Sequence, residues 1–207
     1  MSWGEAVMPD EHRAGTEGGS ETVTPMRFAT VIALDGEGRR RAVRMHWGLV
    51  PPGARDPQNA KPHIHARAES IDEKPTFRDA FRHRRGLVVC STFNEGREIT
   101  PTKTEQYVLT PLDGESVAIA VVWERWSGQE SASLLSFAMV TVPPNALIGT
   151  ITERMPALIE PGNWAAWLGE TSATVAEIKA LLRTSERPLD VQKAVKPAAK
   201  RDQPSFL

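Results

Sequence analysis

The sequence predicts an α+β fold with a mostly antiparallel, barrel-like β-sheet core and a few peripheral helices. Three observations support this class: apolar runs of strand length recur along the chain, turn signals join several of them directly, and few helical segments lie between them. At 207 residues and 40% hydrophobic content, the chain fits one domain. We expect a mobile segment over residues 1–22, a single domain over 23–190 and a flexible tail over 191–207.

The strands are expected in the following order. MRFATVIAL (26–34) and RAVRMHWGLV (41–50) flank the turn DGEGR, which predicts a hairpin. HIHARAES (63–70) follows a proline-rich loop as the next strand, and GLVVCSTFNEG (86–96) is a strand that ends in a polar corner. Residues 105–126 form a second hairpin around Asp113-Gly114, and SLLSFAMVTV (133–142) is another apolar strand.

Three short helices accompany these strands. Pro75 suits the first turn of a basic, amphipathic helix whose apolar face carries Phe77, Ala80 and Phe81. Pro161 opens a second helix, which carries two tryptophans. Thr174 and Glu177 form a capping box for a third.

Composition narrows the range of functions. We expect a cytoplasmic protein without a membrane segment, because the N-terminus lacks the features of a signal peptide and no apolar run could span a bilayer. Cys90 is the single cysteine, which excludes a disulfide framework, and it is interpreted as a small buried hydrophobe.

The net charge of −1 is unevenly distributed. Five acidic residues against one arginine give residues 1–25 a charge of −4, which leaves +3 for the rest. Basic residues cluster at positions 39–44, 78–85 and 193–201. Such clusters are usually solvated faces, and they also suit phosphate binding.

Three short motifs could carry chemistry. His63, His65 and Arg67 stand at alternate positions, so on a strand they lie on one face. That face either forms a proton-active row along a site or is a solvent-exposed surface. A metal site would need further ligands with no obvious source, so we expect none. Glu95 follows an apolar run, where a carboxylate can have a raised pKa and transfer protons, or can pair with an arginine at a rim. Thr152 begins a Thr-Glu-Arg-Met-Pro turn that can equally be a salt-bridged loop.

The order of several motifs resembles the SOS-response-associated peptidase (SRAP) family from about Val23 to Arg187. The segments that carry this resemblance are MHWGLVPPGA, IHARAESIDEKPTFRDAFRHRRGLVVCSTFNEG, VAIAVVWERW, SFAMVTVPPNALIGTITERMPALI and NWAAWL. The resemblance implies a compact barrel-like α+β fold that acts on abasic sites in single-stranded DNA, in the DNA-damage response. It also implies autoproteolytic removal of Met1, after which an N-terminal cysteine traps the sugar aldehyde as a thiazolidine DNA–protein crosslink.

The resemblance assigns site residues unevenly. The family's Asn-Ala-Arg matches His65-Ala66-Arg67, its glutamate matches Glu95, and its His-Asp-Arg-Met-Pro places Thr152 where the histidine stands. Ser2 stands where the family has its cysteine, so both the nucleophile and the usual histidine are absent. The resemblance implies no metal or organic cofactor.

Two hypotheses follow, and a third alternative is a different translation start that supplies the cysteine. In the first, a weakened enzyme forms a transient imine at Ser2, assisted by Glu95 and His65, with slow strand cleavage by β-elimination. In the second, a catalytically silent relative binds single-stranded or junction DNA and associates with the nucleoid. The residues expected to bind DNA are Arg67, Arg154, Arg78, Arg82 and Trp47.

Overall fold

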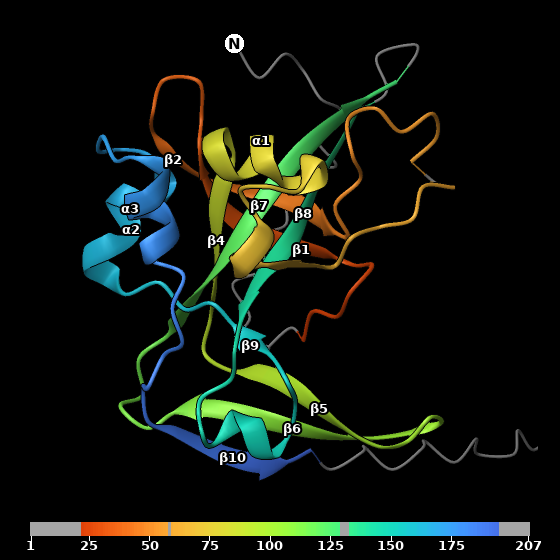
Figure 1. Cartoon of the computed structure of the whole chain (residues 1–207), viewed down its shortest axis with the longest axis vertical. Coiled ribbons are helices and arrows are strands. Elements are labelled where there is room, and N and C mark those ends of the chain that lie inside the picture. Colours follow the sequence, from red (N-terminus) through yellow and green to blue (C-terminus); the bar gives the residue numbers. More distant parts are fainter. Residues whose placement is uncertain (1–21, 58, 129–132, 195–207) are drawn as a thin grey trace, which may run out of the picture.

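The computed structural model describes residues 22–57, 59–128 and 133–194 (Figure 1). Its centre is a closed barrel of five strands, in the order β2-β1-β4-β7-β8. Their bounds are Phe28–Leu34 for β1, Arg40–Trp47 for β2, Arg85–Cys90 for β4, Val117–Ser127 for β7 and Ser133–Val142 for β8. Neighbours in this order are antiparallel, and β2 closes the barrel by pairing in parallel with β8. The α+β class with a barrel-like sheet is confirmed.

Alternate residues of the strands fill the barrel, as the period of two requires. The residues packed together there are Ala29, Val31, Ala33, Met45, Val121, Trp123 and Phe137. The small residues Ala29 and Ala33 of β1 belong to the same cluster as the large rings of Trp123 and Phe137. A Cβ atom on Gly86 would lie 2.6 Å from Cγ1 of Val31, so only glycine leaves the space that this interior uses.

The helices cover the outer face of the barrel. Helix α1 (Pro75–His83) buries Phe77, Ala80 and Phe81 as predicted, and α3 (Val175–Ala180) has the predicted capping box. The two tryptophans belong to α2 (Trp164–Leu168), which follows the 3-10 turn η3 (Pro161–Asn163). Strand β3 (His65–Arg67) pairs in parallel with β8 and is followed by the 3-10 turn η1 (Ala68–Ser70). The 3-10 turn η2 (Ile148–Thr150) precedes β9 (Met155–Pro156), which pairs antiparallel with β8. No helix within the described residues could span a membrane.

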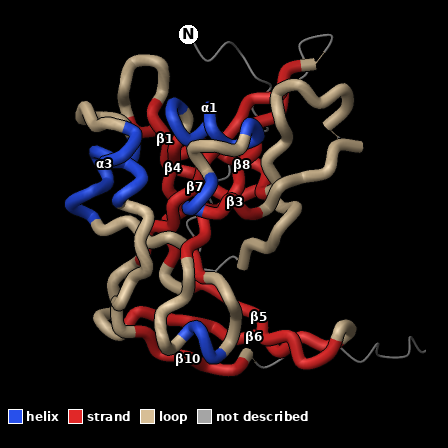
Figure 2. Tube along the Cα trace, in the orientation of Figure 1, coloured by secondary structure: helices blue, strands red, loops and turns tan. Residues whose placement is uncertain are grey.

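A second sheet of three strands lies beside the barrel, at the bottom of Figures 1 and 2. It has the order β10-β6-β5, with β5 at Phe93–Thr100, β6 at Lys103–Pro111 and β10 at Leu189–Lys193. Two sequence predictions are therefore wrong. The apolar run at 86–96 breaks after Cys90 into β4 and β5, which belong to different sheets, and β6 and β7 do not pair as a hairpin. Asp113-Gly114 does turn the chain, but it leads from one sheet into the other, because both edges of β7 pair with β4 and β8.

The chain ends differ from the expected boundaries in one respect. Strand β10 runs to Lys193 and pairs with β6, so regular structure extends three residues past the expected domain end at residue 190. The rest of the expected tail from residue 195, and residues 1–21 of the expected mobile segment, lie outside the described residues.

Candidate active site

A cavity of about 780 Å³ opens at one end of the barrel. All five barrel strands line it, through residues that include Ala29, Trp47, Cys90, Val121 and Phe137. The remaining wall comes from β3, β5 and the turn before β9, and it carries His65, Glu95, Thr152 and Arg154. Thr22–Pro25, the first described residues, also line it. Barrel mouths are a common place for ligand sites, and this one gathers several polar groups over an apolar floor.

An aromatic pair forms part of that floor. The rings of Trp47 and Phe137 stack with centroids 6.0 Å apart and an angle of 16° between their planes. The Trp47 indole Nε1 donates a hydrogen bond to the carbonyl of Ile64 at 3.0 Å, and the His65 ring lies 6.5 Å from the Trp47 ring. Trp47 is therefore held on one face by Phe137 and at its edge by the backbone, as a fixed wall of the cavity.

Glu95 is the main proton-transfer candidate. It lies inside β5, opposite Tyr107 of β6, and not at the end of a strand as the sequence suggested. Burial raises the pKa of its carboxyl to about 7. At neutral pH the side chain is therefore divided between acid and carboxylate, which allows it both to donate and to accept a proton.

The predicted row of His63, His65 and Arg67 is split by the structure. His65 lines the cavity, and desolvation lowers its pKa, which favours the neutral imidazole at pH 7. His63 is absent from the lining; its backbone bridges to Leu49 and its ring packs edge-on against Phe77, with centroids 5.6 Å apart. Arg67 is exposed and lies outside the cavity lining. Within the part of the chain that the structure describes, no three His, Cys, Asp or Glu side chains could hold a metal ion.

Sequence reasoning missed the cavity position of Cys90. Its side chain is half-buried and lines the same cavity as Glu95 and His65, whereas we expected a core residue. Burial raises the pKa of its thiol to about 11, so the thiol is protonated at neutral pH. The signal that could have revealed it is its place at the last position of β4, directly before the break that leads into β5.

The predicted DNA-binding arginines lie in different surroundings. Arg154 reaches the cavity, but its guanidinium binds both carboxylate oxygens of Glu69, at 2.7 and 2.9 Å, and the carbonyl of Thr141. Arg78 pairs with its neighbour Asp79, and both Arg78 and Arg82 lie on α1, away from the cavity lining. The structure thus brings Glu95, His65, Thr152, Trp47 and Arg154 together, and it does not bring in Arg67, Arg78 or Arg82. Ser2 lies outside the described residues.

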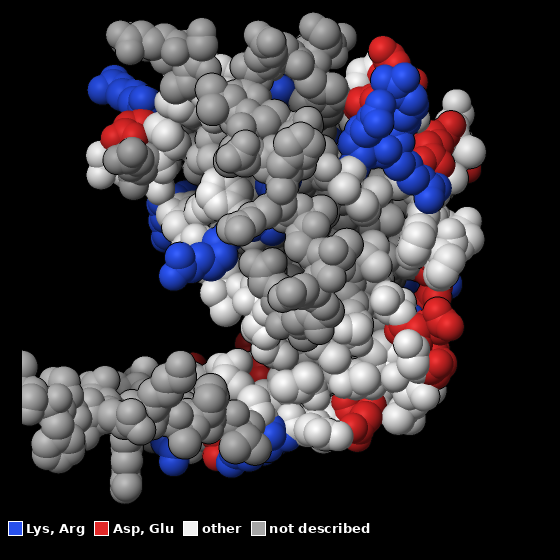
Figure 3. All heavy atoms as spheres, turned by 180° about the vertical axis from the view of Figure 1, so that it is seen from behind, with Lys and Arg blue, Asp and Glu red and all other residues white. Residues whose placement is uncertain are grey.

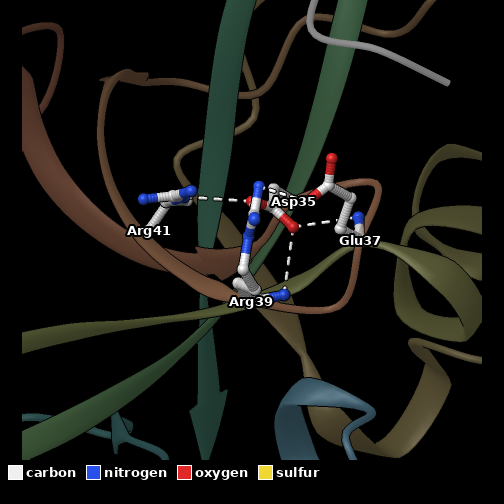
Figure 4. Close-up of polar contacts among 4 residues, drawn as sticks. All are labelled: Asp35, Glu37, Arg39 and Arg41. Atoms are coloured by element: carbon white, nitrogen blue, oxygen red, sulfur yellow. Dashed lines mark hydrogen bonds and ion pairs between the residues drawn. The ribbon is translucent and has the colours of Figure 1, made fainter.

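The arginine cluster at 39–44 contributes mainly to the β1–β2 hairpin. Asp35 accepts hydrogen bonds from the backbone N–H groups of Glu37 and Arg39, and its carboxylate pairs with Arg39 and Arg41 at 3.1 and 3.0 Å (Figure 4). The hydrogen bond from the Arg39 backbone is the largest of several causes that hold the Asp35 pKa far below its usual value. Arg40 binds Glu170 through two hydrogen bonds. These pairs neutralise most of the cluster.

Between the barrel and the three-stranded sheet the molecule is hollowed, as the left side of Figure 3 shows. The fold and the cavity define a small α+β barrel protein with one group of titratable side chains at the barrel mouth.

The chain belongs to a known family. The family model described as SOS response associated peptidase (SRAP) matches residues 7–198. "Abasic site processing protein YoqW" of Bacillus subtilis (strain 168) is 30% identical over 165 residues, which cover 79% of this chain and 73% of that protein. Sequence comparison and the SRAP-like prediction therefore agree.

Solved structures share the fold. A crystal structure of a protein from Bacteroides thetaiotaomicron superimposes with a TM-score of 0.69 at 23% identity, covering 81% of this chain and 74% of that one. A crystal structure of a protein from Bordetella bronchiseptica gives a TM-score of 0.71 at 21% identity, covering 84% and 87%. Both support the barrel architecture described above.

Proposed function

We propose that this protein processes abasic sites in single-stranded DNA and holds the damaged sugar in the barrel-mouth cavity. Membership of the SRAP family and the abasic-site processing name of the YoqW relative support the substrate. The observation that carries the chemistry is the pKa of about 7 at Glu95, in a cavity that also contains His65. Because the substrate is DNA, we expect the protein to act in the cytoplasm and at the nucleoid.

The reaction begins with an amine. Once Met1 is removed, the α-amine of Ser2, with a pKa of roughly 7.7 to 8.0, is neutral in about a tenth of molecules at pH 7. It attacks the C1 aldehyde of the ring-opened sugar, and Glu95 in its acid form donates a proton as water leaves, which yields an imine. A base, the Glu95 carboxylate or His65, then removes a proton from C2, and the 3′-phosphate leaves by β-elimination.

The N-terminal segment must reach the cavity for this step. Thr22–Pro25 line it, so the described part of the chain begins at the site. The twenty residues from Ser2 to Glu21 span at most about 3.3–3.6 Å each when extended, more than enough to return to the cavity.

A second candidate function is plain binding of single-stranded or junction DNA. The observation that favours it is Thr152, whose hydroxyl cannot titrate near pH 7, at the position where the family resemblance places a histidine. The serine hydroxyl of Ser2 likewise supplies essentially no nucleophilic anion without a base, in contrast to a cysteine thiol. In this case Arg67 and the arginines of α1 contact phosphates and no covalent step occurs.

One experiment separates the two. A single-stranded oligonucleotide with one abasic site is incubated with the protein, with and without borohydride, and run on a denaturing gel. We expect a shifted band with borohydride, because reduction traps the imine. Glu95→Gln should weaken that band about tenfold or more, the usual size of a general acid–base contribution being 10²–10⁴. Glu98→Gln, an exposed change on the same strand, should leave it unchanged.

The remaining outcomes identify the alternative. No band in either lane, together with salt-sensitive binding of the same strand, would establish the binding protein. Intact mass must also show that Met1 is removed, because otherwise the reacting α-amine belongs to Met1 and not to Ser2.

A further inference from the structure

The cavity wall that carries Thr152 is a turn with its own hydrogen bonds. The Asn145 side chain accepts a hydrogen bond from the N–H of Ile148 at 2.9 Å. The carbonyl of Ile148 accepts hydrogen bonds from the N–H groups of Ile151 at 2.8 Å and Thr152 at 3.0 Å. These hydrogen bonds join residues 145–152 into one unit that includes Thr152.

This unit is anchored on several sides. Asn145 Nδ2 donates to the carbonyl of Ser185 at 2.9 Å, and Arg154, just beyond the turn, is held by Glu69. On another side, Arg97 Nη2 donates to the carbonyl of Thr150 at 2.5 Å. Among these anchors, only Arg97 comes from β5, the strand that carries Glu95.

Arg97 is well placed to link the turn that carries Thr152 to the strand that carries Glu95. It lies two residues after Glu95, so both side chains point to the same face of β5. Its guanidinium carbon lies 5.3 Å from the centre of the ring of Tyr107, the residue opposite Glu95 in β6. The guanidinium is therefore held by two contacts, the cation–π contact with Tyr107 and the hydrogen bond to the Thr150 carbonyl.

The burial of Arg97 also has a cost. Its Nε atom is buried and has no hydrogen-bond partner among the described residues. A buried N–H without a partner is unfavourable, so the contacts with Thr150 and Tyr107 must hold the side chain inward against that cost.

We infer that Arg97 is a positioning residue, which ties the turn that carries Thr152 to the strand that carries Glu95 and so fixes the width of the cavity between them. This inference rests on the proposed function, because the width matters only if Glu95 acts on a bound sugar. Arg97 itself does not line the cavity. The charged or titratable residues that line it beside Glu95 are Arg44, His65, Cys90 and Arg154, and replacing Arg97 leaves all four in place.

The test compares three variants of the full chain. Arg97→Ala removes the link, Arg97→Lys keeps a cation that can still reach the Thr150 carbonyl, and Lys193→Ala is the control. Lys193 forms an ion pair with Glu105 at 2.5 Å in the same sheet. Glu105 lies opposite Arg97 in β6, and no side-chain hydrogen bond or ion pair among the described residues joins Lys193 or Glu105 to the turn. Three quantities are measured: the rate of borohydride-trapped adduct at saturating DNA, the Kd for the abasic strand, and amide hydrogen exchange at Ile151 and Thr152.

We expect Arg97→Ala to slow the adduct rate about tenfold, since a misplacement of about 1 Å can cost a hundredfold, while Kd changes less than about twofold. Arg97→Lys should restore most of the rate. Exchange at Ile151 and Thr152 should rise about tenfold in Arg97→Ala and stay unchanged in Lys193→Ala, as expected for a local opening.

Other results would overturn the inference. Unchanged exchange and rate in Arg97→Ala would mean that Arg97 does not hold the turn. An equal loss of rate and affinity in Arg97→Ala and Lys193→Ala would mean general destabilisation of the sheet. If the unaltered protein forms no adduct, the proposed function fails and the catalytic part of this inference with it. In that case, hydrogen exchange at Ile151 and Thr152 in Arg97→Ala still tests whether Arg97 anchors the turn.

Discussion

At the scale of single residues, the surroundings of a carboxyl group decide its charge. Glu95 and Asp35 have similar intrinsic acidity, yet burial raises the pKa of Glu95 to about 7, whereas hydrogen bonds from the β1–β2 turn and its arginines lower that of Asp35. Both carboxyl groups are desolvated, and the sequence does not show that hydrogen bonds offset this cost at Asp35 but not at Glu95. Glu95 is therefore suited to proton transfer, and Asp35 to holding a turn.

The pKa of Glu95 makes stability depend on pH. In the unfolded chain the carboxyl loses its proton near pH 4.5, and in the folded state near pH 7. The folded state thus binds more protons between these values, and its stability falls as pH rises through them. Relative to Glu95→Gln, we expect the unaltered protein to lose on the order of 2 kcal/mol between pH 4 and pH 8. Thermal melting would show this as a difference of roughly 4 to 8 °C at pH 8 that vanishes at pH 4. Parallel curves for the two proteins would contradict the raised pKa.

Cys90 should react slowly although it faces a cavity. Burial shifts the pKa of its thiol from 9.0 to about 11, so the thiolate fraction at neutral pH falls about a hundredfold. We expect iodoacetamide to label the folded protein about a hundred times more slowly than the same protein in urea, with the rate rising with pH up to about 11. As the single cysteine, it gives an unambiguous mass shift. Equal rates in both states would show that the thiol is solvated.

At the scale of elements, Arg85 joins two helix ends to the barrel. Its side chain is only 7% exposed, and its guanidinium donates to the carbonyls of Phe81, Arg82 and Trp167 at 2.7, 2.6 and 2.5 Å. These carbonyls belong to the last turns of α1 and α2, which lack partners within the helix and favour a cation. An arginine that the sequence groups with a basic, possible phosphate-binding cluster is thus part of the core.

Replacing Arg85 should destabilise the fold strongly. Arg85→Met keeps an apolar stem of similar length but leaves three carbonyls without their donor, and we expect a loss of about 3 kcal/mol. The urea midpoint measures it. Arg82→Met, an exposed change at the end of α1, should stay within about 0.5 kcal/mol of the unaltered protein. A similar loss in both would mean that the lost positive charge, and not the lost hydrogen bonds, is the cause.

Sequence reasoning predicted the positions of strands and helices better than which strands pair with one another. The hairpin of β1 and β2, the helix at Pro75 and the capping box at Thr174 were correct, because short-range periodicity and turn chemistry determine them. The supposed hairpin of β6 and β7 was wrong, because a turn signal reverses the chain without choosing which strand edge it meets.

The candidate site shows the same limit. Motif order led to Glu95, His65 and Thr152, which do meet in one cavity. Arg97 was missed because its inferred role depends on a hydrogen bond to Thr150, which lies 53 residues later in the chain. Likewise, Arg154 is held by Glu69, which lies 85 residues earlier and cannot be read from a local pattern.

At the scale of the whole molecule, many of the arginines are already paired. Figure 3 shows basic and acidic atoms side by side over parts of its face. Ion pairs hold Arg39, Arg40, Arg84, Arg154 and Arg187. We therefore propose that phosphate contacts come from arginines outside these pairs, such as the exposed Arg67.

The salt dependence of DNA binding tests this distinction. Arg67→Ala should lower the slope of log Kd against log salt by about 0.7, the value for one phosphate contact on a single strand. Arg39→Ala should leave the slope unchanged, because its guanidinium is already paired with Asp35 and Glu37. Equal changes in the two slopes would mean that long-range charge, not contact, attracts the strand.

The barrel closes through a narrow seam. Strand β2 meets β8 at only two residue pairs, His46 with Ser136 and Trp47 with Phe137, about ninety residues apart in the chain. Closing so long a loop carries an entropic cost that few contacts offset, so we expect this seam to form late in folding. Trp47 and Phe137 are also the floor of the cavity. We therefore expect the cavity to be completed late in folding, and a chain whose seam is still open to lack the Trp47–Phe137 floor on which the proposed site is built.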